Sequence, residues 1–112
     1  MKNSEFILQL KELCEGAKKP DSSLSKNGCL PVGWESEYLD LLSQNRLYWQ
    51  NIEAWPRELF YCFYRVSYHH KYAYDSWLLN NKPNQRTETA LHKIRLFTES
   101  FITGSPEDAW QS

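Results

Sequence analysis

The chain has 112 residues, of which 41% are hydrophobic and 24% are charged, and its formal net charge is −1. This length and composition are typical of one globular domain with its own core, and the near-neutral charge argues against a nucleic-acid binder, which needs a basic excess on one face. Aromatic residues make up 15% of the chain, and such rings either fill a core or form recognition surfaces.

The first predicted helix covers residues 4–15. It begins at Ser4, a favourable N-cap, and ends before Gly16. Apolar residues recur here at helical spacing: Phe6, Leu10, Leu13, Cys14 and Ala17. Polar residues interrupt the segment too often for a signal peptide or a transmembrane span, so we expect a cytoplasmic protein.

Residues 18–33 are rich in proline, glycine and serine and are predicted to form a loop, long for a compact domain. Three further helices follow, over residues 36–52, 56–79 and 85–103. Pro56 suits the first turn of the third of these four helices, and Gly104 with Pro106 ends the last one. We expect the tail, residues 105–112, to be frayed. No segment alternates with a period of two residues. The sequence therefore predicts an all-α fold, a four-helix bundle or irregular helical array with a long loop after the first helix.

The third predicted helix has two different faces. At about 100° per residue, one arc carries the residues expected in the core: Leu59, Cys62, Phe63, Val66, His70, Ala73 and Trp77. The opposite arc carries four tyrosines, flanked by two basic residues. These six residues form the candidate partner-binding surface: Tyr61, Tyr64, Arg65, Tyr68, Lys71 and Tyr72. The alternative interpretation is that other helices cover this helix on both sides, which would make the tyrosines part of the core.

Residues 65–72 also contain a short motif, R-x-x-x-x-H-x-Y. This string is similar to the active-site signature of HEPN ribonucleases, small all-helical toxins that cleave RNA across a dimer. The resemblance implies that Arg65 binds the scissile phosphate and that His70 acts as the acid/base group, with Tyr72 beside them. In a regular α-helix, however, Arg65 and His70 would point about 140° apart.

Other catalytic and metal-binding patterns are absent from the sequence. His69 and His70 are adjacent, so at most one of them could join a metal site, and neither H-x-x-x-H nor a zinc-type Cys/His spacing occurs. The three cysteines lack C-x-x-C spacing and are expected to be reduced thiols, with Cys62 inert on the core arc. We therefore expect no metal and no cofactor.

The hypothesis that best fits these features is a non-enzymatic protein that binds another protein through the tyrosines. Toxin-neutralising immunity or antitoxin proteins are one such class, and their partner would be a toxin or effector. A HEPN-like, metal-independent ribonuclease is the first alternative. The second is a structural subunit that forms a homodimer through the same face. We expect no membrane association, because neither the charge nor the hydropathy favours it.

Overall fold

The computed structural model describes residues 2–104, and the expectations for residues 105–112 lie outside this range. Within it the chain is all-helical and contains no strand. The elements in chain order are α1 (Lys2–Cys14), α2 (Asp21–Asn27), α3 (Trp34–Gln50), α4 (Arg57–Tyr64), the π-helical turn η1 (Arg65–His69), α5 (His70–Leu78) and α6 (Gln85–Thr103). Because α4, η1 and α5 follow one another without a break, they form one long helix, here called the central helix.

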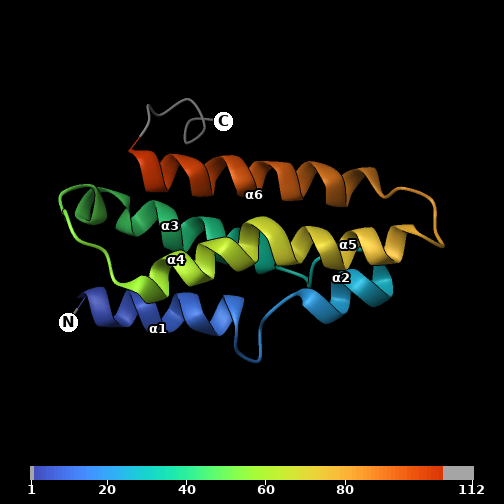
Figure 1. The fold of residues 1–112 in the computed structure, drawn as a ribbon, viewed down its shortest axis with the longest axis horizontal. Coiled ribbons are helices and arrows are strands. Elements are labelled where there is room, and N and C mark those ends of the chain that lie inside the picture. The colour runs from blue at the N-terminus through green and yellow to red at the C-terminus, as the bar shows by residue number, and fades with distance from the viewer. Residues whose placement is uncertain (1, 105–112) are drawn as a thin grey trace.

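The central helix crosses the middle of the molecule (Figure 1). The helices α1 and α2 lie end to end along one side of it, α6 lies along the other side, and α3 lies behind. Contacts agree with this picture, since α1 packs on α3 and α4, α2 on α5, and α6 on α3 and η1. Among the helices of residues 2–104, none covers the side of the central helix that faces away from α3.

A core of aromatic and aliphatic side chains joins α1, α3, the central helix and α6. The ring of Phe101 on α6 lies 5.8 Å from that of Phe6 and 5.6 Å from that of Phe63, measured between centroids. A buried hydrogen bond of 2.7 Å joins the Tyr38 hydroxyl on α3 to Thr98 on α6. Four of the apolar residues predicted along the first helix, Phe6, Leu10, Leu13 and Cys14, are in this core, whereas Ala17 lies beyond α1 and is exposed.

The predicted loop over residues 18–33 is the main departure from expectation, because it contains the helix α2. A helix of seven residues is too short to be stable alone, so tertiary packing must hold it. Leu24 is fully buried, and Gly28, which ends the helix at φ 67°, packs against the ring of Trp77. The Gly28 carbonyl also accepts a 2.6 Å hydrogen bond from the Thr87 hydroxyl.

Three predicted helix boundaries shift by two residues. The helix predicted over residues 36–52 spans Trp34–Gln50, and the buried indole of Trp34 donates a 3.1 Å hydrogen bond to the Leu13 carbonyl. The first helix begins at Lys2 rather than Ser4. The last helix coincides with the predicted range, because the Asn84 side chain accepts from the Thr87 amide at its start and Gly104 adopts φ 69° at its end.

The central helix departs from regular geometry at η1, where the His70 amide donates to the Arg65 carbonyl five residues back. A π-helical turn holds more residues than an α-helical one. The predicted core arc was wrong beyond this turn. Ala73 and Trp77, which were expected in the core, are only half-buried, and Tyr74, which was not, is buried. Residues spaced four apart drift by about 40° per step in an α-helix. The wider turn offsets that drift, so Cys62, Val66, His70 and Tyr74 all face the interior.

Candidate partner-binding surface

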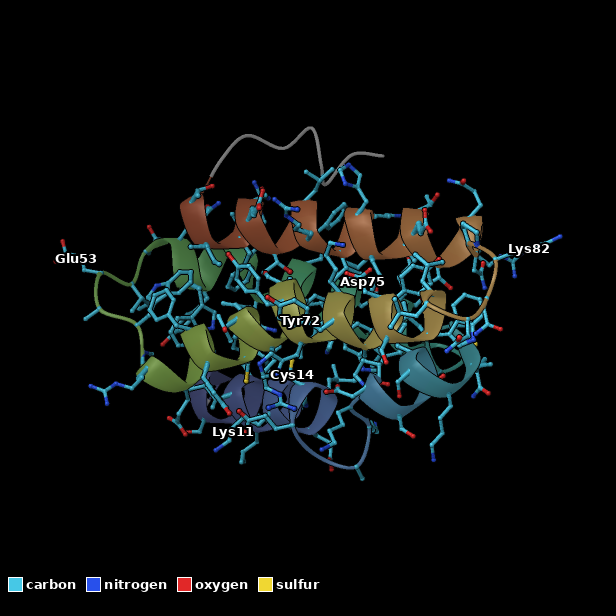
Figure 2. All side chains as sticks on the ribbon, turned by 45° about the vertical axis from the view of Figure 1, so that its right-hand side comes forward. Lys11, Cys14, Glu53, Tyr72, Asp75 and Lys82 are labelled. Carbon is cyan, nitrogen blue, oxygen red and sulfur yellow. The ribbon has the colours of Figure 1, made fainter. Side chains whose placement is uncertain are left out.

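Four tyrosines lie on the uncovered side of the central helix: Tyr61, Tyr64, Tyr68 and Tyr72. We call these four residues the tyrosine face. Their exposed fractions are 50%, 50%, 52% and 66% in chain order, so none belongs to the core. Figure 2 shows Tyr72 on the outer side of this helix. The question that the sequence left open, whether these rings are covered by other helices, is thus answered by the structure: they reach solvent.

Ring contacts hold part of the tyrosine face in place. The ring centroids of Tyr64 and Tyr68 lie 4.9 Å apart, and the imidazole of His69 meets the Tyr64 ring edge-on at 5.3 Å. The guanidinium carbon of Arg65 lies 5.9 Å from the Tyr61 ring centroid, within cation–π range. Contacts of this kind restrict the torsional freedom of these side chains.

The two basic residues predicted beside the tyrosines differ in their surroundings. Arg65 turns inward, and its side chain is only 15% exposed. Its Nε donates to the Cys14 carbonyl at the end of α1 (3.1 Å), and its Nη2 lies 3.5 Å from a carboxylate oxygen of Asp21. Lys71 stays 65% exposed and pairs with Asp75 one turn later at 3.1 Å. Both positive charges therefore have an acidic partner, and the surface is closer to neutral than the sequence suggested.

The Arg-His-Tyr motif is only partly assembled. Arg65 and His70 both approach the Asp21 carboxylate, His70 Nε2 at 3.8 Å from Oδ1. The angle of about 140° applies to a regular α-helix, whereas here a π-helical turn lies between the two residues. Tyr72, in contrast, lies on the exposed tyrosine face.

His70 is fully buried, with its ring edge-on to Trp34 at 5.3 Å between centroids. Burial lowers the pKa of His70 from 6.5 to about 4, although the nearby Asp21 carboxylate acts in the opposite direction. A neutral imidazole enclosed on all sides offers no open route to a ribose hydroxyl. The geometry thus supports a structural role for His70 at the junction of α2 with the central helix.

Sequence reasoning missed Asp21, because it lay in a segment predicted to be a loop. Nothing in its neighbourhood, Pro20-Asp21-Ser22, distinguishes an acid that enters the interior from one that faces solvent. Its Oδ1 is buried without a hydrogen-bond partner among the described residues. Only the packing of α2 on the central helix places this carboxylate beside Arg65 and His70.

No group of three or more metal-binding side chains comes together within residues 2–104. Cys14 and Cys62 are both buried and their thiols form a hydrogen bond, which together with burial raises the pKa of Cys14. Cys29 is exposed. Cys62 is buried, as its place on the predicted core arc indicated, and the hydrogen bond from the Cys14 thiol lowers the pKa of Cys62.

A groove of about 360 Å³ runs beside the tyrosine face, between the central helix and α6. Its apolar lining comes from Val66, Leu78 and Leu91, and its rim carries both basic and acidic side chains, including Lys71 and Arg95. In the same groove, the Tyr74 hydroxyl donates a 2.6 Å hydrogen bond to the Glu88 carboxylate. The tyrosine face and this groove together form a ridge with an adjoining hollow.

Comparison of the chain with protein-family models, with curated proteins and with solved structures finds no match. Over the part of the chain that the structure describes, no helix combines the length and the apolar character needed to cross a bilayer.

Proposed function

We propose that this protein binds another protein through the tyrosine face. The observation that carries the proposal is the exposure of Tyr61, Tyr64, Tyr68 and Tyr72, each at least half exposed, along one side of a single helix. Tyrosine offers a large apolar ring, few torsions to immobilise and a hydroxyl that tolerates water. These properties explain why tyrosine is enriched in protein interfaces and among the residues that dominate binding energy.

The charges around the face favour a partner recognised by shape rather than by electrostatic attraction. Lys71 pairs with Asp75 on the central helix, and Lys11 of α1 pairs with Glu58 at 3.3 Å. Arg65 is engaged with Asp21. Since opposite charges alternate along the edges, the binding energy would come mainly from burying rings, and it would depend little on salt.

The groove between the central helix and α6 supports the same proposal. A partner that covers the tyrosine face could insert an apolar side chain against Val66, Leu78 and Leu91. Energetically important interface residues commonly fill such hollows on the opposite surface. The exposed rings and the adjacent hollow would then be buried together in one interface.

We further propose that the partner is a toxin or effector and that binding neutralises it, as immunity and antitoxin proteins do. Such a role requires a rigid surface that can block the partner's own site. A helical scaffold with a preorganised aromatic face has that property. The proposal places the protein in the cytoplasm, where it would protect the cell that makes it.

Site-specific photo-crosslinking tests the proposal directly. A photoreactive phenylalanine analogue replaces Tyr68 in one protein and Leu47, 69% exposed on α3, in the control. We expect one discrete crosslinked partner from position 68 and none from position 47. Growth of cells that express the crosslinked partner, with and without this protein, then tests neutralisation. Equal crosslinking from the two positions would refute the tyrosine face as the binding surface, and growth arrest that this protein does not relieve would refute neutralisation.

A further inference from the structure

A second hollow lies at the end of the molecule where α3 and α6 both finish (Figure 1). It is a cleft of about 610 Å³, within the range of sites that bind small molecules. The cleft is lined by the last turns of these two helices, by segment 51–55 and by Phe60 on α4. It is separate from the tyrosine face, so an inference about it does not rest on the function proposed above.

The walls of the cleft are aromatic. The Trp55 ring lies 5.8 Å from Trp49, 5.7 Å from Phe60 and 5.6 Å from Phe101, measured between centroids. Two hydrogen bonds from the Trp55 indole N–H, to the Trp49 carbonyl at 3.2 Å and the Ile52 carbonyl at 2.8 Å, hold the ring in its orientation. Phe60 is 47% exposed and therefore accessible at the mouth. Trp49 and Phe101 are themselves buried, so the aromatic surface that the cleft offers to a ligand is that of Trp55 and Phe60.

The electrostatic character of the cleft is negative. The carboxyl end of a helix carries a partial negative charge of about half an elementary charge, and two such ends, those of α3 at Gln50 and α6 at Thr103, meet here. Among the described residues that line the cleft, Glu53 is the sole ionisable one, and no lysine, arginine or histidine joins it. Glu53 extends from the outer tip of the connecting segment (Figure 2). Phosphates and other anions are disfavoured in such a place.

We propose that this cleft binds a small organic cation with an alkylammonium head group. Ring faces attract cations electrostatically, and the attraction strengthens when the cation is removed from water. Here the rings of Trp55 and Phe60, the ends of two helices and the Glu53 carboxylate all favour positive charge. A quaternary ammonium matches this combination, because it presents positive charge on an apolar surface that needs no hydrogen-bond acceptor.

Choline is the probe, and 3,3-dimethylbutan-1-ol, which has the same shape without the charge, is the matched control. Binding is followed by tryptophan fluorescence and by calorimetry, with sodium chloride replacing choline chloride at equal concentration as a blank. We expect saturable binding of choline and binding of the neutral alcohol weaker by about tenfold or more, the equivalent of about 1.4 kcal/mol of cation–π and charge attraction. Absence of saturable choline binding, or equal binding of the alcohol, would overturn the proposal.

Two substitutions locate the site. Phe60→Leu keeps an apolar side chain but removes the ring, and Glu53→Gln removes the carboxylate. Both positions are exposed, so we expect both variants to fold, which circular dichroism would verify. Each is expected to weaken choline binding several-fold. Asp40→Asn, on an exposed part of α3 outside the cleft, changes the net charge as Glu53→Gln does and should leave binding unchanged. Unchanged binding in both cleft variants, or equal weakening by Asp40→Asn, would contradict the assignment.

Discussion

Gly28→Ala tests the packing of α2 on the central helix. Gly28 adopts φ 67°, a left-handed conformation, and a Cβ atom added there would clash with the Trp77 ring. The backbone strain alone costs about 1–2 kcal/mol. The ring cannot move away freely because it packs beside α2, and inserting a methyl group into a packed site costs about 1–3 kcal/mol more. We therefore expect a total loss of about 2–5 kcal/mol in the free energy of unfolding.

Gly104→Ala is the matched control, because Gly104 also ends a helix in the left-handed region, at φ 69°, and no atom of the described residues comes within 4 Å of an added Cβ. It should lose only the strain contribution, about 1–2 kcal/mol. Urea denaturation of both variants and of the unsubstituted protein measures the two losses. Repeating Gly28→Ala in a Trp77→Leu background should reduce its cost toward that of Gly104→Ala. Equal losses at Gly28 and Gly104 in the original background would refute the packing of α2 against Trp77.

Three further predictions concern the core, the buried histidine and the tyrosine face. The pKa of His70 is lowered from 6.5 to about 4, so between these pH values the unfolded chain binds more protons than the folded protein. The free energy of unfolding should therefore fall by about 3 kcal/mol as the pH is lowered from 6.5 to about 4. His70→Asn should flatten this dependence, as urea titrations at several pH values would measure. Tyr38→Phe, which removes the hydroxyl bonded to Thr98, should cost about 1 kcal/mol by the same method. Tyr68→Ser should change the free energy of unfolding by less than about 0.5 kcal/mol, because Tyr68 is exposed. Phe63→Ala, at a buried position, should cost about 3–5 kcal/mol. A comparable loss in both variants would place Tyr68 in the core.

The all-helical fold and most helix boundaries could be predicted because the signals are local. The last helix shows this best, since Asn84 accepts from the Thr87 amide at its start and Gly104 adopts the left-handed conformation at its end. Both are properties of a few neighbouring residues and require no knowledge of the rest of the chain. Spacing also placed the four tyrosines on one side of a helix, because 3.6-residue periodicity is a property of the helix itself.

Tertiary packing decided the features on which function depends. The helix α2 forms where it packs on α5, with Leu24 buried and its C-cap Gly28 against the Trp77 ring, since seven residues cannot sustain a helix alone. The π-helical turn adds a residue to the central helix and directs Arg65 and His70 to the same carboxylate, a change that no local motif indicated. The sequence by itself determined the helices and the side on which the tyrosines lie. Whether those tyrosines reach solvent depended on how many helices surround the central one, because exposure is a property of the assembled molecule and not of the segment.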